Sequence, residues 1–463
     1  MKKTYIIVML LMASMMAEAQ TSVWNGNRRL WTRGEGTESN PYLIESAENL
    51  AFLSYMVNKG IDTRGLYFEL TTDIDLNGSE DQPWYPIGMG NRWFADDGCE
   101  RIVDPSFNIN NVFAGHFDGG GHSIYNLYVD GLDYAGLFGC LYCWYDEGTT
   151  IENVSIESGY IHGKSSGGIV GECEGIVYIA NCQNNAEIEG TEAAGGIVGT
   201  GGKVISKCSN SGHISSSYIA GGIAGMMAKE VTECFNTGSI IVNNGYTAGG
   251  ILGRRGGGQV VIANCYNRGD LSGSADYGIG GIAGIANGNG NTTNIRNCYN
   301  VGSIANDGGD AGGLFGYYEV GHFENVYYLN TCGGWGLGTS KTAEEMRDPA
   351  FVNTLNHNTD VWGFDEDNIN DGYPILTGTL MSTDEATTMM SIYPNPVKDQ
   401  LSLTFANGIK PENVTLYDLQ GRLVETKHND MEIIDMSAMP AGVYMLHVIM
   451  KDGTSYHEKI LKE

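Results

Sequence analysis

A short glycine motif recurs seven times through the middle of this chain and constrains its fold more than any other feature. In its commonest form the motif reads Gly-Gly-Ile-x-Gly, and successive copies end 32, 28, 26, 28, 31 and 32 residues apart. A unit of this size cannot bury its own hydrophobic face, so such units must stack on one another. The spacing therefore predicts a solenoid. The seven copies are Ala135–Gly139, Gly167–Gly171, Gly195–Gly199, Gly221–Gly225, Gly249–Gly253, Gly280–Gly284 and Gly312–Gly316.

Two further slots recur in each unit. About ten residues after the glycines comes an apolar-x-polar-Cys-x-Asn pattern, and a third apolar residue follows shortly after it. Three short strands bounded by Gly, Asn or Ser describe one coil of a three-sided parallel β-helix, with about 28 residues per coil. The Cys-Asn pattern occupies Ile179–Asn184, Ile205–Asn210, Val231–Asn236, Ile262–Asn267 and Ile295–Asn300, and the third slot holds Ile188, Ile214, Ile240, Leu271 and Ile304.

Stacked coils place equivalent residues in ladders along the solenoid axis. The first ladder is expected to point inward and consists of Leu137, Ile169, Ile197, Ile223, Ile251, Ile282 and Leu314. The second is an asparagine ladder of Asn184, Asn210, Asn236, Asn267 and Asn300. We expect these asparagines at a turn, because Asn tolerates a left-handed φ and its amide can bond from coil to coil. A calcium role is disfavoured, because calcium sites use clustered carboxylates and none align here.

Cysteine usage requires a separate interpretation, because ten cysteines in an exported chain normally indicate disulfides. Five share one slot of the repeat, which holds valine at Val154 and Val326 in the flanking units. A slot that accepts Val or Cys is a small buried apolar position, and we expect a ladder of free thiols there. The ladder is Cys182, Cys208, Cys234, Cys265 and Cys298. A bridge is expected among Cys140, Cys143 and Cys173, whereas the state of Cys99 and Cys332 stays open.

Each end of a solenoid needs a cover, because a terminal coil presents an open strand edge. Residues 46–60 predict an amphipathic helix with Ser46 as N-cap and Gly60 as its stop. A second helix is predicted over residues 342–355, after the last repeat. We interpret both helices as end caps, although lids over a ligand are the alternative.

The chain start and the overall charge bear on location. A basic start, a short apolar run and an Ala-x-Ala site predict a secretory signal peptide over residues 1–19. No later stretch is long enough for a transmembrane helix. The formal net charge of -29 indicates solubility outside the cell and disfavours nucleic acid as a partner.

The repeats resemble those of GLUG-motif proteins over residues of about 30 to 378. Further stretches that carry the resemblance are Asn40–Ile44, Leu70–Leu76, Trp84–Gly88 and Phe113–Leu127. The resemblance implies an exported right-handed parallel β-helix, often on surface or adhesin-like proteins and occasionally beside a protease domain. No His-Glu-x-x-His signature occurs here, so protease activity is not carried over.

The C-terminal stretch has a different pattern. Period-two strands with Asp and Gly turns after residue 390 predict a small antiparallel β-sandwich. It resembles the type A sorting domain of the type IX secretion system, through Tyr393–Pro396, Asp418–Arg422, Pro440–Tyr444 and the Lys459–Lys462 tail. The resemblance implies passage across the outer membrane and makes the secretion machinery a partner.

These features divide the chain into six segments. They are a signal peptide (1–19), an N-terminal cap with the first coils (20–134), the GLUG-type repeats (135–338), a C-terminal cap helix and closing segment (339–378), a linker (379–390) and the sorting domain (391–463). The predicted fold class is all-β, with a parallel β-helix, short capping helices and a small antiparallel sandwich.

The sequence favours a binding or structural protein of adhesin-like type, expected to be a monomer. A stripe of aromatics on the outer face suits a glycan or protein ligand, with packing at coil corners as the alternative. The stripe would comprise Phe235, Tyr266, Tyr299, Tyr317, Tyr318, Tyr327 and Tyr328. The rival hypothesis is a polysaccharide lyase or glycoside hydrolase, for which the polar candidates are Asp73, Asp75, His116, Asp118, His122, Arg254 and Arg255. We assign no catalytic, metal-binding or cofactor-binding residue, and no cofactor is expected.

Overall fold

The computed structural model describes residues 21–90, 111–143, 148–285, 293–317, 321–357 and 360–377, together with the strands and a few flanking residues of the C-terminal domain between 390 and 462. The predicted leader (1–19) and linker (379–390, except Met390), Cys99, Tyr318 and Pro394–Asn395–Pro396 lie outside the described residues. The chain forms two compact units, Met1–Gly363 with Pro374–Ser382, and Phe364–Tyr373 with Thr383–Glu463.

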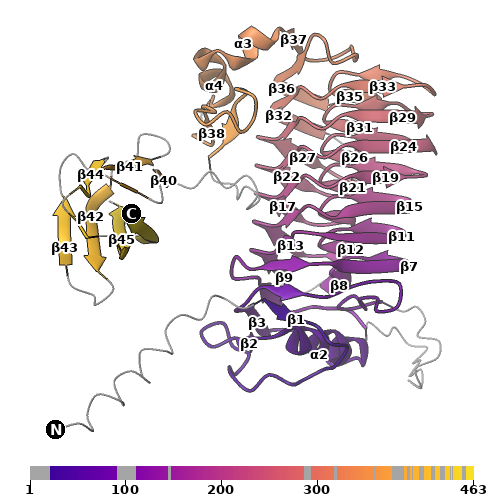
Figure 1. Ribbon diagram of the computed structural model, residues 1–463. Coiled ribbons are helices and arrows are strands. Elements are labelled where there is room, and N and C mark those ends of the chain that lie inside the picture. Colours follow the sequence, from indigo (N-terminus) through magenta and orange to yellow (C-terminus); the bar gives the residue numbers. More distant parts are fainter. Residues whose placement is uncertain are drawn as a thin grey trace, which may run out of the picture. The chain divides into compact units, whose positions relative to one another are not determined.

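The first unit is a parallel β-solenoid of about nine turns, as the glycine spacing predicts (Figure 1). Its strands form three sheets, one along each side of the coil, and every pairing within these sheets is parallel between successive coils. Equivalent residues therefore lie one strand spacing, about 4.8 Å, apart along the axis.

The first sheet has 19 strands. They are β1 (Ser22–Val23), β2 (Tyr42–Ile44), β3 (Tyr67–Leu70), β4 (Ile74–Asp75), β5 (His116–Asp118), β6 (Ser123–Tyr125), β9 (Thr149–Glu152), β10 (Ser155–Ile156), β13 (Val177–Ala180), β14 (Gln183–Asn184), β17 (Val204–Ser206), β18 (Ser209–Asn210), β22 (Glu230–Thr232), β23 (Phe235–Asn236), β27 (Val260–Ala263), β28 (Tyr266–Asn267), β32 (Thr293–Asn300), β36 (Gly321–Leu329) and β37 (Thr339–Lys341).

The second sheet has 11 strands and the third has seven. The second contains β7 (Leu127–Ala135), β11 (Gly159–Gly167), β15 (Glu187–Gly195), β19 (Ile214–Ser216), β20 (Ile219–Gly221), β24 (Ile240–Gly245), β25 (Thr247–Gly249), β29 (Leu271–Ala275), β30 (Ile279–Gly280), β33 (Ile304–Asn306) and β34 (Ala311–Gly312). The third contains β8 (Phe138–Cys143), β12 (Val170–Gly175), β16 (Val198–Thr200), β21 (Ala224–Met226), β26 (Leu252–Arg254), β31 (Ala283–Ile285) and β35 (Phe315–Tyr317).

The inward ladder from Leu137 to Leu314 is confirmed, because all seven side chains are fully buried in one continuous core. The asparagine ladder is also confirmed as a coil-to-coil network. Each Asn Nδ2 from Asn184 to Asn267 donates to the Oδ1 of the next asparagine at 2.8 Å. The second Nδ2 hydrogen goes to the carbonyl two residues on, as from Asn210 to Gly212 at 2.9 Å. Every asparagine in this ladder is fully buried.

Of the two expected reasons for those asparagines, the left-handed φ was wrong, because none of them has a positive φ, whereas the amide bonding from coil to coil is present. Positive φ occurs instead at the residue directly before the cysteine slot, such as Asn181 (52°), Lys207 (54°) and Glu233 (54°). The asparagine ladder fills the interior beside the second glycine of the motif. A Cβ on Gly222, for example, would lie 2.6 Å from the Cβ of Asn236. The glycine motif and the Cys-x-Asn pattern are thus two halves of one packing arrangement.

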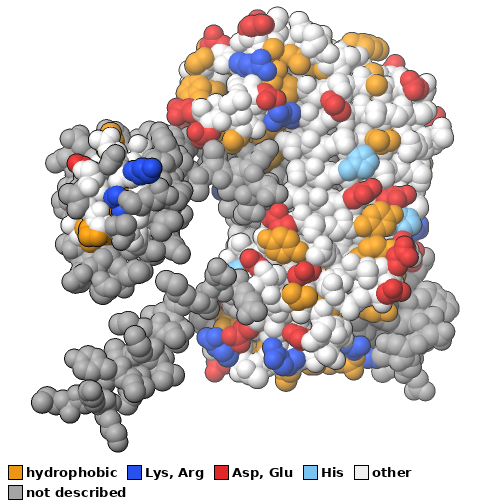
Figure 2. Space-filling model, viewed as in Figure 1, with side chains coloured by type: hydrophobic (Ala, Val, Ile, Leu, Met, Phe, Trp, Pro, Cys, Tyr) orange, Lys and Arg blue, Asp and Glu red, His pale blue; other side chains and the backbone are white. Residues whose placement is uncertain are grey.

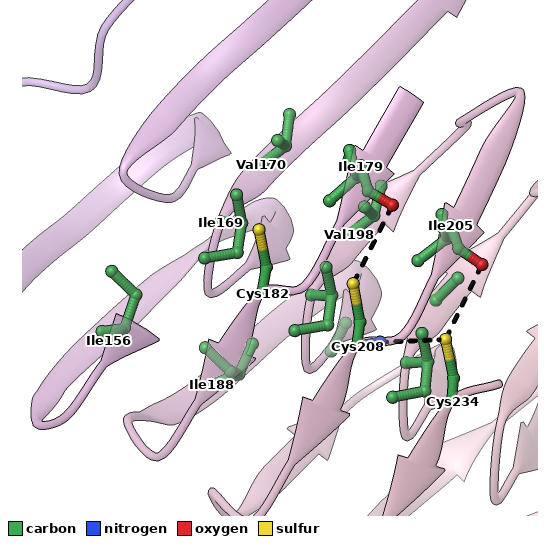
Figure 3. Close-up of a cluster of buried hydrophobic side chains, with 14 of the residues drawn as sticks. Ile156, Ile169, Val170, Ile179, Cys182, Ile188, Val198, Ile205, Cys208 and Cys234 are labelled. Atoms are coloured by element: carbon green, nitrogen blue, oxygen red, sulfur yellow. Dashed lines mark hydrogen bonds between the residues drawn. The ribbon is translucent and has the colours of Figure 1, made fainter. Parts of the chain in front are cut away.

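The cysteine ladder contains free, fully buried thiols, as predicted (Figure 3). Cys182, Cys208 and Cys234 lie one above another, and the backbone N–H of Cys208 donates to the sulfur of Cys234 at 3.4 Å. Val154 and Val326 occupy the same column at its two ends. Burial raises the pKa of the Cys182 thiol well above its usual value.

This column gives a first testable prediction. Cys208→Val should shift the free energy of unfolding by less than about 1.5 kcal/mol, because the volume and apolar character of the slot are kept. Cys208→Asp should prevent folding, because it buries a carboxylate among apolar side chains. Urea unfolding followed by circular dichroism measures both. Equal losses for the two variants would contradict the account of this slot.

The expected bridge among Cys140, Cys143 and Cys173 was wrong, because none of the three forms a disulfide. The strand register explains why. Cys173 of β12 pairs with Leu141 of β8, Cys140 pairs with Glu172, and Cys143 pairs with Gly175. Cys140 and Cys173 therefore point to opposite faces of the sheet. Cys332, whose state was open, is also a buried free thiol.

Both ends of the solenoid are covered. Helix α2 (Ala47–Asn58) begins at Ser46, whose side chain accepts from the Asn49 N–H, as predicted. Its residues Leu50, Leu53 and Val57 enter the solenoid core. At the other end the predicted helix of residues 342–355 is two helices, α3 (Ala343–Arg347) and α4 (Pro349–Leu355). The break falls at Asp348, because a residue before proline is disfavoured in the helical conformation and Asp348 caps α4 instead. Two short antiparallel strands, β38 (Trp362–Gly363) and β39 (Ile375–Leu376), follow.

The C-terminal domain has two antiparallel sheets, as expected for a small sandwich. Side chains of both sheets, including Leu401, Ile434, Leu416 and Leu446, share one buried core. One sheet contains β40 (Met390–Tyr393), β41 (Gln400–Phe405) and β44 (Ile433–Asp435), and the other contains β42 (Pro411–Asp418), β43 (Leu423–Lys427), β45 (Gly442–Met450) and β46 (Ser455–Lys462).

Candidate functional site

Four tyrosines form a row on the solenoid, three at the bend between successive strands of the 11-stranded sheet and one at the end of a strand of the seven-stranded sheet. We call Tyr218, Tyr246, Tyr277 and Tyr317 the tyrosine strip. Ring centroids are 5.3 Å apart between Tyr218 and Tyr246, 4.3 Å between Tyr246 and Tyr277, and 6.1 Å between Tyr277 and Tyr317. Tyr218, Tyr277 and Tyr317 are 41%, 46% and 36% exposed. Large aromatics at this exposure in adjacent positions indicate an interaction surface.

The repeat itself positions the strip. Tyr218, Tyr246 and Tyr277 each stand three residues before the first glycine of a motif copy, so stacking of the coils aligns them. The neighbouring register pairs Ile219–Thr247 and Ala248–Ile279 fix this alignment. Tyr317 comes from β35 of the adjacent sheet and meets Tyr277 edge-on, with an interplanar angle of 85°.

The rings of the strip pack against one another at tilted or edge-on angles. The planes of Tyr218 and Tyr246 are 34° apart, and those of Tyr246 and Tyr277 are 38° apart. The guanidinium of Arg254 lies 5.2 Å from the Tyr246 ring centroid, in a cation–π contact. Burial raises the pKa of Tyr246, and the nearby Arg254 partly offsets this shift.

An acidic group continues the strip toward the N-terminal coils. Glu192 lies one coil before Tyr218 in register, and its Oε2 is 3.0 Å from the Lys164 Nζ. Glu172, in the neighbouring sheet, interacts electrostatically with Glu174, Glu192 and Lys164. We call Glu172, Glu174 and Glu192 the acidic end. Figure 2 shows acidic side chains spread over the visible face of the solenoid, with basic ones mainly toward its two ends.

Glu172 gives a second prediction. Burial, and then repulsion from Glu174 and Glu192, raises the pKa of Glu172 above 4.5 in the folded protein, although a hydrogen bond with Tyr134 opposes this shift. A folded pKa above the unfolded one means that the folded state binds the proton more tightly. Folding stability therefore falls as pH rises from about 4.5 through the folded pKa. Glu172→Gln should raise the midpoint of thermal unfolding at pH 7 and leave it unchanged at pH 4. A lower midpoint at pH 7 would show that ionised Glu172 stabilises the fold.

The aromatic stripe expected from the sequence exists as a stack, but it is not a surface. Phe235, Tyr266 and Tyr299 are buried, with centroid spacings of 4.9 and 5.1 Å and planes 2° and 6° apart. Trp362 packs on Tyr299 at 5.5 Å, and Phe351 of α4 packs on Tyr327 at 5.0 Å. Of the two alternatives for these residues, the structure supports internal packing, because they are buried and the C-terminal cap lies against Tyr266, Tyr299 and Tyr327. Among the residues of the expected set that the structure describes, only Tyr317 belongs to the tyrosine strip.

The polar candidates for catalysis have structural partners. Asp73 Oδ1 accepts from the Ser123 N–H and lies 3.0 Å from His122 Nδ1. His116 Nδ1 lies 2.9 Å from the Thr150 hydroxyl, and its ring stacks on Tyr67. Asp75 Oδ1 accepts from the Asn77 N–H and from Asn126 Nδ2.

Asp118 differs from the other polar candidates because a second carboxyl group lies beside it in the next coil. Its Oδ1 accepts from the Gly120 N–H and from Asn153 Nδ2, both at 2.8 Å. Strand register places Glu69, Asp118 and Glu152 in one row across β3, β5 and β9. Burial, and then the Asp118 carboxylate, raises the pKa of Glu152. The carboxylate of Asp118 therefore accepts two hydrogen bonds, whereas the neighbouring carboxyl of Glu152 has a raised pKa and keeps its proton more tightly. Sequence reasoning missed Glu152, because its partnership depends on coil register.

The candidates Arg254 and Arg255 lie in different surroundings. Arg255 is buried and its guanidinium donates to the Gly258 carbonyl, whereas Arg254 covers Tyr246. Among the described residues, no group of three or more His, Cys, Asp or Glu is arranged to hold a metal ion. Within the same residues, no helix has the length and apolar character to cross a bilayer.

Comparison with known proteins identifies one domain. Residues 391–463 match the protein family described as the secretion system C-terminal sorting domain. Of the four stretches that carried the sorting-domain resemblance, Tyr393 and Lys459–Lys462 lie in described strands, whereas residues 419–422 and Ala441 lie outside the described residues.

The solenoid has partial relatives. Halomucin from Haloquadratum walsbyi is 29% identical over 202 residues, which is 41% of this chain and 2% of Halomucin. A "Putative Gly-rich membrane protein" from Evansella cellulosilytica is 30% identical over 162 residues, 34% of this chain and 16% of that protein. The chain thus spans a small part of either relative. The crystal structure of a "putative immunoglobulin A1 protease" from Bacteroides ovatus matches 75% of this chain and 95% of its own, with 22% identity and a TM-score of 0.48.

Proposed function

We propose that this protein, which its sorting domain sends through the type IX secretion system to the cell surface or the medium, is an adhesin-like binding protein that engages a macromolecular ligand through the tyrosine strip. The observation that carries the proposal is the alignment of Tyr218, Tyr246 and Tyr277 in successive coils, with the first and last exposed and Tyr246 half-buried. A continuous hydrophobic core runs beneath them, so the rings are held in place before a ligand arrives. Such preorganisation lowers the entropy cost of binding.

The proposal includes the finer organisation that the sequence predicts. The repeats of residues 135–338 are of GLUG type, between a cap with first coils (20–134) and a closing segment (339–378). The leader (1–19) is removed after Ala19, and the domain at 391–463 is the type A sorting domain, joined by the linker at 379–390. The mature chain acts as a monomer. N-terminal sequencing of the exported protein is expected to begin at Gln20.

Array binding tests the function. The mature chain is applied to arrays of extracellular host proteins and of glycans, beside the double variant Tyr218→Ser/Tyr277→Ser. Tyr178→Ser is the matched control, because Tyr178 is 39% exposed but lies on the 19-stranded sheet. We expect ligands that the native chain and the control retain and the double variant loses. An absence of ligands, or binding that survives loss of the strip, would overturn the proposal.

A glycan-active enzyme is the second candidate, favoured by the unequal carboxyls of Asp118 and Glu152. Adjacent coils are about 4.8 Å apart, close to the roughly 5–5.5 Å between the carboxyl groups of retaining glycosidases. Asp118 would attack the anomeric carbon while Glu152 protonates the leaving oxygen, and water would then release the sugar. Reducing ends formed from a polysaccharide panel, and lost in both Asp118→Asn and Glu152→Gln, would support this function. Product formation that survives both changes would exclude it.

A further inference from the structure

We propose that the ligand of the tyrosine strip is an extended polypeptide segment with alternating apolar and cationic side chains, whose cationic groups meet the acidic end. This inference rests on the proposed function, because it needs the strip to be the binding surface. It goes further by identifying the ligand as a polypeptide and not a sugar. Three features of the surface support this assignment: the orientation of the tyrosine rings, the charge at each end of the strip, and the length of the strip.

Ring orientation disfavours a sugar. A pyranose binds an aromatic residue by lying flat on the ring face, and such stacking needs the face to be open. In the strip, each face of Tyr246 has a neighbour, because Tyr218 and Tyr277 lie at 5.3 and 4.3 Å. Arg254 adds a further contact with the Tyr246 ring. The middle of the strip therefore offers no open ring face for a sugar, whereas its exposed ring edges suit apolar side chains of a peptide.

Charge selects the partner's side chains. Glu172, Glu174 and Glu192 lie at one end of the strip, with Lys164 as the cation that pairs with Glu192. At the other end Asp276 directly precedes Tyr277, and Asp310 is also exposed. Arg254 is already placed over Tyr246. Carboxylates at both ends of an aromatic surface complement lysine or arginine, whose cations can also lie near tyrosine rings.

The length of the surface fits an extended peptide. From Lys164 to Tyr277 the row crosses four coil spacings, through Glu192, Tyr218 and Tyr246. Four spacings of about 4.8 Å give about 19 Å, which an extended chain covers with about six residues at 3.3 Å each. An octapeptide is therefore long enough to reach both the tyrosines and the acidic end.

Fluorescence anisotropy with labelled octapeptides tests the inference on the full mature chain. The probe alternates lysine and leucine, and the matched peptides alternate glutamate and leucine, or glycine and serine. Cellohexaose and xylohexaose serve as competitors. We expect the lysine–leucine probe to bind at least tenfold more tightly than the glutamate–leucine peptide, with no displacement by either sugar.

Variants separate the strip from the general negative charge of the protein. Tyr218→Ser/Tyr277→Ser should abolish probe binding, and Glu172→Gln/Glu192→Gln should weaken it at least fivefold. Glu230→Gln and Tyr178→Ser, both on the 19-stranded sheet, should leave it unchanged. Binding that weakens equally in Glu230→Gln would mean non-specific attraction and overturn the inference.

The outcomes also distinguish a failure of the peptide assignment from a failure of the proposed binding function. Displacement by a sugar, or failure of the lysine–leucine probe beside a strip-dependent array ligand of another kind, overturns the peptide assignment alone. If the Tyr218→Ser/Tyr277→Ser variant binds both the array ligands and the peptide probe as the native chain does, the binding function is overturned as well.

Discussion

Asn236→Ala is expected to destabilise the solenoid by about 3–6 kcal/mol, because it leaves several buried polar groups without partners. The Nδ2 of Asn236 donates to Asn267 Oδ1 and to the Gly238 carbonyl, each at 2.8 Å. Its Oδ1 accepts from Asn210 Nδ2 at 2.8 Å. The three asparagines are fully buried and Gly238 is buried, so water cannot replace the lost bonds without entering the core.

Asn243→Ala is the matched control, because Asn243 is an exposed asparagine of the same coil. Urea unfolding followed by circular dichroism should show a large drop in midpoint for Asn236→Ala and almost none for Asn243→Ala. Similar midpoints for the two variants would mean that the asparagine ladder contributes little to stability.

Gly222→Ala should be at least as damaging, although it adds a single methyl group. That methyl would lie 2.6 Å from the Cβ of Asn236 and closer still to the carbonyl oxygen of Gly250 in the next coil. Neither atom is the end of a flexible side chain, so two coils would have to separate. We expect a loss of more than about 3 kcal/mol, at or beyond the upper end of ordinary overpacking.

Gly257→Ala provides the comparison, because a Cβ there meets nothing within 4 Å and no positive φ is required. Limited proteolysis and thermal unfolding should show native behaviour for Gly257→Ala and an opened or unfolded solenoid for Gly222→Ala. A native melting point for Gly222→Ala would mean that the coils are farther apart than the structure places them.

The coil-level architecture could be predicted because it is periodic in the sequence. The glycine spacing defines the coils, and the Val154 and Val326 substitutions reveal a buried thiol column without any knowledge of contacts. The N-terminal helix was predictable because Ser46 and Gly60 are local signals. The helix break at Asp348 could also have been predicted, because Pro349 disfavours a helical conformation in the residue before it.

The surface was harder to predict, because burial of an aromatic row depends on residues distant in sequence. Phe235, Tyr266 and Tyr299 have the sequence pattern of an outer stripe, but they are buried. Phe351 and Trp362 of the C-terminal cap pack against Tyr299, and Trp362 also lies near Tyr266. The tyrosine strip left a signal that was missed, since Tyr218, Tyr246 and Tyr277 keep a fixed distance from the glycine motif. The acidic end gave no such signal, because Glu172 and Glu192 belong to different sheets and come within electrostatic range of each other only in the folded chain.

The most direct test of the account is the distance between coils in solution, measured by pulsed electron spin resonance. Register places Tyr128, Glu187 and Ser303 in one row of the 11-stranded sheet. The nine described native thiols are buried, so with Cys99 replaced by serine a nitroxide reagent reaches cysteines introduced in that row. Four spacings separate Glu187 from Ser303 and six separate Tyr128 from Ser303, which predicts backbone distances of about 19 and 29 Å. Two distances that do not differ by about 10 Å would contradict in-register stacking, and with it the alignment of the tyrosine strip.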